Sequence, residues 1–148
     1  LLVDRVLGEG LELTQYERAE YTPLHSWSAD VFDAEVTTGP SVTVSMESRG
    51  LLPLEKTLRF TEAGALEVTY RWDPASLPAA AYFAPELSVA RDPGVTFDPE
   101  PADVWRYDIV TVSKRESGLE ETAQGESITP LWPCALGKAR LLLPAGTS

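Results

Sequence analysis

Residues 41–72 read SVTVSMESRGLLPLEKTLRFTEAGALEVTYRW, and apolar side chains occupy every second position in three parts of this stretch. These apolar positions are Val42, Val44 and Met46, then Leu58 and Phe60, then Leu66, Val68, Tyr70 and Trp72. Such alternation is typical of strands that turn one face to a core and the other to water. Short turns at residues 49–53 and 61–64 separate the three segments, which predicts a three-stranded antiparallel meander.

The rest of the chain repeats this strand-like pattern. Further strands are predicted near residues 11–16, 30–36, 81–90, 107–114, 119–124, 127–131 and 139–143, with one extended loop at residues 91–103. No window of a dozen residues keeps the apolar stripe of a helix, and 12 prolines and 10 glycines interrupt the chain. We therefore expect residues 1–148 to form a single all-β domain, an antiparallel, supersandwich-like β-sandwich with less than about 10% helix.

The composition fits a globular domain and excludes several classes of partner. Hydrophobic residues make up 43% of the 148 residues, which is enough for a core without disulfides or metals. The formal net charge of −11 argues against nucleic acid and anionic membranes as partners, because phosphate groups are bound by clustered Lys and Arg. No apolar run approaches the ~20 residues of a membrane span, and the first residues lack the features of a signal peptide. Because the sequence starts at Leu1 rather than Met, we expect a fragment of a larger protein.

The sequence contains no recognisable catalytic, metal-binding or cofactor-binding motif, so we predict none of these sites. His25 is the only histidine, and no serine lies in a Gly-x-Ser-x-Gly elbow, which excludes a hydrolytic triad. One His and one Cys cannot supply the usual zinc ligands, and glycine-rich phosphate loops and EF-hand loops are missing. Cys134 is the only cysteine and lies in the apolar segment 131–136, which predicts a buried, inert thiol. Because no internal disulfide is possible, we expect a reducing compartment, the cytoplasm.

The four tryptophans are candidates either for the core or for binding a carbohydrate, because aromatic faces stack on the C–H faces of sugars. Trp72 ends an alternating apolar segment and Trp132 has apolar neighbours, so both are expected in the core. Trp27, beside His25, and Trp105, at the end of the long loop, are expected to be freer. We therefore name Trp27, Trp105 and His25 as candidate carbohydrate-binding residues.

Glu86 is the fourth candidate, because it lies within the apolar segment 82–89, where a carboxylate is expected to need a partner. Two interpretations stay open. The functional one is a buried acid with a raised pKa, able to donate a proton or to bind a sugar. The structural one is a carboxylate bonded to a neighbouring hydroxyl or Arg, or one that lies on the solvent face.

Several segments together resemble the C-terminal β-sandwich of glycoside hydrolase family 57, a group that includes α-amylases and 4-α-glucanotransferases. The segments are LEKTLRF at 54–60, LEVTYRW at 66–72, YFAPELS at 82–88, GLEETAQG at 118–125 and LWP at 131–133, with a fainter match at 16–19 and 24–25. In place of the family's Asp before the histidine the chain has Leu24, and Trp27 replaces its Phe. The sandwich of that family is also similar to galactose-mutarotase-type supersandwiches. A mutarotase would need a His and Glu pair in a groove, and the single, poorly placed His25 argues against that activity.

The resemblance implies a function but no catalytic residue. The catalytic carboxylates of that family lie in its barrel, and no part of this chain resembles the barrel. The chain is therefore expected to be a non-catalytic accessory domain, a C-terminal fragment that supports or covers the active site of a separate catalytic barrel in the same parent chain. An α-glucan oligosaccharide is a further possible partner. The alternatives are an independent carbohydrate-binding module that uses exposed aromatics, and a structural or interaction sandwich without a ligand.

Overall fold

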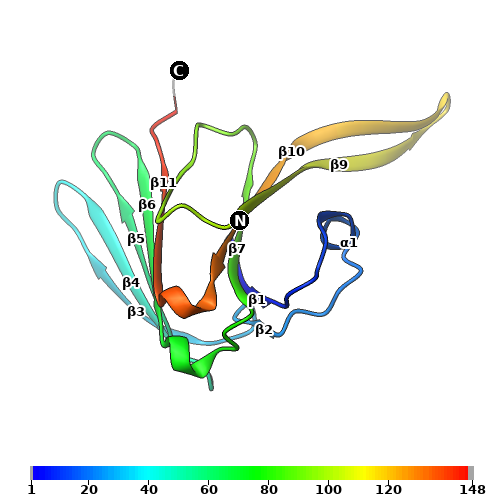
Figure 1. Cartoon of the computed structure of the whole chain (residues 1–148). Coiled ribbons are helices and arrows are strands. Elements are labelled where there is room, and N and C mark those ends of the chain that lie inside the picture. The colour runs from blue at the N-terminus through cyan, green and yellow to red at the C-terminus, as the bar shows by residue number, and fades with distance from the viewer. Residues whose placement is uncertain (1, 147–148) are drawn as a thin grey trace.

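The computed structural model describes residues 2–146, which form two antiparallel sheets packed face to face (Figure 1). The first sheet has the strand order β2-β1-β7-β10-β9, with β1 Leu2–Leu7, β2 His25–Ser26, β7 Tyr82–Val89, β9 Asp103–Arg115 and β10 Gly118–Pro133. The second has the order β3-β4-β5-β6-β11-β8, with β3 Phe32–Thr37, β4 Val42–Ser48, β5 Leu54–Phe60, β6 Leu66–Trp72, β8 Thr96–Asp98 and β11 Lys138–Leu143. Strands make up 56% of the structure and helices 8%, which confirms the predicted all-β sandwich with little helix.

The predicted meander is confirmed as β4, β5 and β6, which are paired in register through Val44, Leu58 and Val68. The segments 119–124 and 127–131, predicted as two strands, form the single long strand β10. Strands β1, β2 and β8 were not predicted, and β8 lies inside the segment expected to be a loop.

The prediction of a strand at 11–16 is wrong, because this segment contains the helix α1, Leu13–Glu17. The side-chain oxygen of Gln15 accepts a hydrogen bond from the backbone N–H of Glu12 at 3.1 Å, which satisfies a free donor at the start of the helix. The helix turns Tyr16 into the protein, where it is 3% exposed. Tertiary packing of this one ring thus outweighs the strand-like alternation. Two short 3-10 helices complete the elements, η1 at Pro74–Ser76 and η2 at Cys134–Leu136.

The main core lies between the two sheets and contains most of the large aromatic side chains. Phe83 is at its centre and contacts the rings of Trp27, Tyr70 and Trp72 at centroid distances of 5.8, 4.9 and 4.4 Å. Trp72 and Trp132 are 6% and 0% exposed, so their predicted place in the core is confirmed. Because each aromatic ring removes a large apolar area from water, this cluster supplies much of the stabilisation that holds the two sheets together.

The core contains one ion pair that the sequence did not lead us to expect. Lys56 on β5 and Asp4 on β1 point into the sandwich and form an ion pair of 2.8 Å, with side chains only 10% and 4% exposed. Cys134 is fully buried, and burial raises its pKa to about 11, which confirms the prediction of an inert thiol.

The hairpin of β9 and β10 extends well beyond the rest of the first sheet (Figure 1). The pairing of its strands shifts between Ala123 and Gly125, so that β10 contains one extra residue, a β-bulge, at Gln124. A Cβ atom at Gly125 would lie 2.4 Å from the carbonyl oxygen of Val89, which no side chain could accommodate. The bulge therefore sits where β10 leaves its neighbour β7.

Candidate functional site

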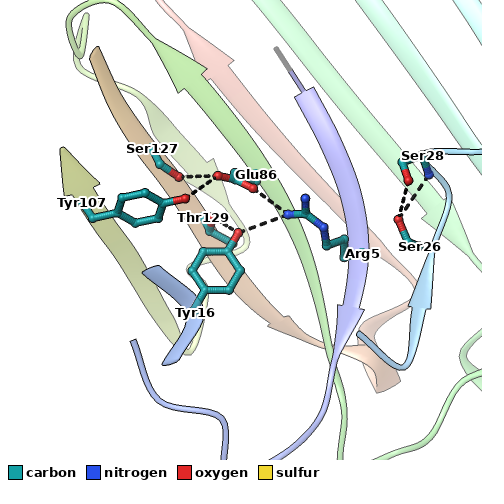
Figure 2. Close-up of polar contacts among 8 residues, drawn as sticks. All are labelled: Arg5, Tyr16, Ser26, Ser28, Glu86, Tyr107, Ser127 and Thr129. Carbon is teal, nitrogen blue, oxygen red and sulfur yellow. Dashed lines mark hydrogen bonds and ion pairs between the residues drawn. The ribbon is translucent and has the colours of Figure 1, made fainter. Parts of the chain in front are cut away.

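A cluster of polar and aromatic side chains lies on the outer face of the first sheet, the face that α1 covers (Figures 1 and 2). Residues at every second position of a strand share a face, which brings side chains from four strands together here. The members are Arg5 on β1, Glu86 on β7, Trp105 and Tyr107 on β9, Ser127 and Thr129 on β10, and Tyr16 on α1. We call this set the Glu86 cluster.

Glu86 is the centre of the cluster and uses both carboxylate oxygens. Its Oε2 accepts from Nη1 of Arg5 at 2.6 Å, and its Oε1 accepts from the hydroxyls of Ser127 at 2.8 Å and Tyr107 at 2.9 Å (Figure 2). The side chains of Glu86 and Arg5 are 14% and 22% exposed. The carboxylate is thus held by one cation and two hydroxyls in a half-buried setting, where charge-assisted hydrogen bonds are strong.

The electrostatic balance at Glu86 favours its ionised form. Burial alone would raise the pKa, but the hydrogen bonds from Arg5, Ser127 and Tyr107 outweigh it, so that the pKa is lowered. Of the two interpretations left open, the buried acid with a raised pKa is therefore wrong, because these donors favour the ionised carboxylate. Of the two interpretations of Glu86, the structural carboxylate bonded to Arg and hydroxyl groups is the one that its contacts fit.

Tyr16 joins the polar part of the cluster to an aromatic part. Its hydroxyl shares a 2.9 Å hydrogen bond with Thr129 and accepts from Arg5 at 3.5 Å (Figure 2). Its ring lies 5.2 Å from both Tyr21 and Trp105, centroid to centroid. Burial raises the pKa of Tyr16 strongly, so the hydroxyl stays protonated and acts as a hydrogen-bonding group only.

A hollow of about 320 Å³ opens beside the cluster, lined by Gly8, Gly10, Leu11, Tyr82, Ala102, Asp103, Trp105 and Leu131. Trp105 is 8% exposed, and its Nε1 donates to Oδ2 of Asp103 at 3.2 Å. The exposed carboxylate of Asp103 could accept a hydrogen bond from a sugar hydroxyl in this hollow, whereas only a small part of the Trp105 ring is open to a ligand.

The four predicted site residues do not come together. Trp105 and Glu86 belong to one cluster, but Trp27 is 2% exposed and packs in the main core, so the expectation that it is free is wrong. Trp105 is also buried more fully than expected, because Tyr16 covers its ring. His25 packs edge-on against Trp27 at a centroid distance of 4.6 Å, and its buried Nε2 has no hydrogen-bond partner among the described residues.

The sequence interpretation missed Arg5, Tyr16, Tyr107, Ser127 and Thr129. The only local signal was the pair of hydroxyls two residues apart on β10, Ser127 and Thr129, within an otherwise apolar segment. Such a pair on one face of a buried strand needs polar partners, and a carboxylate such as Glu86 is a suitable one.

Within residues 2–146, no group of three or more His, Cys, Asp or Glu side chains is arranged to hold a metal ion. None of the helices in the same range has the length and the apolar character that a membrane span requires.

Two comparisons relate the chain to known proteins. Residues 91–142 match the family model described as "Alpha-amylase/4-alpha-glucanotransferase, C-terminal". The fold is similar to the crystal structure of 4-alpha-glucanotransferase from Thermococcus litoralis, with a TM-score of 0.72 and 20% sequence identity. The match covers 97% of this chain but 27% of that chain, and at this identity it establishes the shared fold alone. No curated protein sequence matches the chain. The resemblance that the sequence indicated, to the C-terminal domain of α-amylases and 4-α-glucanotransferases, is thus confirmed.

Proposed function

We propose that this chain is a non-catalytic accessory β-sandwich domain of an α-glucan-active glycoside hydrolase or 4-α-glucanotransferase, where it supports or covers the active site of a separate catalytic barrel. The observation that carries the proposal is the extent of the structural match. Nearly the whole of this chain, 97%, aligns with only 27% of the glucanotransferase chain. Such a proportion is what one domain of a multidomain enzyme gives.

The chemistry of the Glu86 cluster supports a non-catalytic role. Cleavage of a glycosidic bond usually needs two carboxyl groups about 5–9.5 Å apart, one of them a general acid with a raised pKa. Glu86 has a lowered pKa and is bonded to Arg5, so it stays ionised near neutral pH and has no proton to donate. The cluster instead ties α1 to four strands and gives the outer face of the sheet a defined shape.

The test compares the 148-residue chain with its parent chain. Each is incubated with maltoheptaose, and the products are separated by length. We expect shorter or longer products from the parent only. Shorter or longer products from the 148-residue chain that vanish in Glu86→Gln would show that the cluster is catalytic. A complete reading frame of about 148 residues would remove the premise of a separate barrel.

A second candidate is a carbohydrate-binding module, and the hollow beside Trp105 is the observation that favours it. Isothermal titration of the chain with maltooligosaccharides separates the two candidates. Binding that is millimolar or tighter and is lost in Asp103→Asn supports the module, whereas a titration without detectable binding supports the accessory role. Asp103 is the better position to change because it is exposed, while truncation of the buried Trp105 or Trp27 would disturb the fold. The same titration of His25→Ala and Glu86→Gln tests the two other predicted sugar-binding residues, and a loss of binding in either variant would place that residue in the sugar site.

A further inference from the structure

The outer part of the β9–β10 hairpin is a ribbon of two strands without a third neighbour. Strand β10 pairs with β7 only from Glu126 onward, and β9 is the edge strand of its sheet. Residues 109–125 therefore pair only with each other, in the part of the hairpin that projects from the sandwich (Figure 1). We call these residues the ribbon. A two-stranded hairpin is at best marginally stable in water by itself.

The ribbon has one apolar and one polar face. Cross-strand pairs share a face, so the pairs Val110–Ala123, Val112–Glu121 and Lys114–Leu119 lie on one side. Val110, Val112 and Leu119 are 49%, 58% and 77% exposed, and none of them belongs to a hydrophobic cluster of the described residues. These three side chains and Ala123 form what we call the apolar face of the ribbon.

The opposite face is polar and makes its own hydrogen bonds. Arg115 forms an ion pair of 2.5 Å with Glu120, and the side-chain amide of Gln124 donates to Oγ1 of Thr111 at 3.1 Å. One face of the ribbon is thus polar, while the other exposes Val110, Val112 and Leu119, with the charged side chains of Glu121 and Lys114 paired across from the last two. Exposed apolar side chains gathered on one face of a folded domain are typical of an interaction surface.

The apolar face is not an extension of the core of the sandwich. Arg106 lies between the two on the same side of β9, where it forms ion pairs with Asp92 at 2.7 Å and Glu126 at 3.3 Å. This charged belt closes the end of the core. Beyond the belt, Val110 and Val112 are about half exposed and belong to none of the hydrophobic clusters of the described residues.

We propose that the apolar face of the ribbon docks on the catalytic domain of the same parent chain; this inference rests on the function proposed above. Two observations favour this occupant. The family match at residues 91–142 includes the whole ribbon, and most of the glucanotransferase chain lies outside the matched part. A second copy of this chain is a poorer occupant, because two domains of net charge −11 repel each other.

The test uses Val112→Glu in the parent chain, with Ser113→Glu as its matched control. The two positions are adjacent on β9 and exposed, and they point to opposite faces of the ribbon. Hydrogen exchange is measured on the amides of residues 109–125. We expect exchange at least tenfold slower in the parent than in the 148-residue chain, which corresponds to about 1.4 kcal/mol of docking. Val112→Glu should abolish this difference, and Ser113→Glu should keep it.

Several outcomes would overturn the proposal. Equal exchange in the two variants would show that the apolar face is not the contact. Equal protection in the parent and the dilute 148-residue chain would show that the ribbon needs no partner. Slower exchange in the 148-residue chain at high concentration, with a dimer in sedimentation that Val112→Glu removes, would make a second copy the occupant. Glucan activity in the parent is measured separately. A protected ribbon in a parent without that activity supports docking and overturns the proposed function. An unprotected ribbon in a parent with glucan activity overturns docking and supports the proposed function.

Discussion

The buried ion pair between Asp4 and Lys56 allows a quantitative test of the core. Lys56→Met keeps an unbranched apolar side chain, one atom shorter, but removes the charge 2.8 Å from Oδ2 of Asp4. The other carboxylate oxygen, Oδ1, has no partner within hydrogen-bond distance among the described residues, and the carboxylate also raises the pKa of the buried Tyr70 hydroxyl, after the larger effect of burial. The variant therefore leaves a buried carboxylate without compensation, a situation that costs about 3–5 kcal/mol of the free energy of unfolding.

The assay is urea denaturation followed by tryptophan fluorescence. For an m-value of about 2 kcal/mol/M, the midpoint of Lys56→Met should fall by roughly 1.5–2.5 M. The matched control is Arg59→Met on the same strand, where an exposed ion pair with Glu67 is worth at most about 1 kcal/mol. The double variant Asp4→Leu/Lys56→Met should recover most of the loss, because no charge is left buried. If Lys56→Met unfolds at the same midpoint as Arg59→Met, the reasoning about a desolvated pair is wrong.

Three further predictions concern single sites. Glu86→Gln should lower the free energy of unfolding by about 2 kcal/mol at pH 7. Because the pKa of Glu86 is lowered in the folded state, its stabilisation is present above the ordinary pKa of 4.5 and is lost as the pH falls through the folded-state pKa. The stability of the variant should therefore depend less on pH in this acid range. With a pKa of about 11, Cys134 has about one thiolate in a thousand at pH 8, so an aromatic disulfide reagent should label it only in denaturant, and rapid labelling of the native chain would contradict the burial. Gly125→Ala should lower the free energy of unfolding by about 1–3 kcal/mol in urea denaturation, because its Cβ would meet the carbonyl oxygen of Val89. Gly39→Ala should change the midpoint little, because its Cβ would come no closer than 4.0 Å to the backbone oxygen of Ser41.

The sequence predicts the strands of the second sheet best, because their pairing is local. Strands β4, β5 and β6 follow one another through short turns and have regular alternation, so each predicts its neighbour. Strand β1 shows the opposite case. Its core-facing Asp4 breaks the apolar pattern, and the partner that makes this acceptable, Lys56, lies 52 residues away. No pattern within the strand itself could therefore indicate it.

The candidate site was less predictable for the same reason. Glu86 was recognised as an acid in an apolar strand, but its partners Arg5, Tyr107 and Ser127 are 81, 21 and 41 residues distant. The sign of a pKa shift depends on such partners and not on local hydrophobicity. The exposure of a tryptophan has the same dependence, since Trp27 is buried by contact with Phe83 from the distant strand β7.

The bulge at Gln124 decides which side chains of β10 share a face with which side chains of β9. Without the bulge, the pairing would continue regularly from Gly125–Ile109 toward the tip. Gln124 would then pair with Val110 and Ala123 with Thr111, so Ala123 and Leu119 would lie on the polar face. By absorbing one residue, the bulge instead brings the odd-numbered apolar residues of β10 onto the same side as the even-numbered valines of β9. A strand that loses one residue normally turns over every side chain beyond that point. Here the chain has one position, Gln124, where a deletion would preserve the orientation of every residue out to the tip.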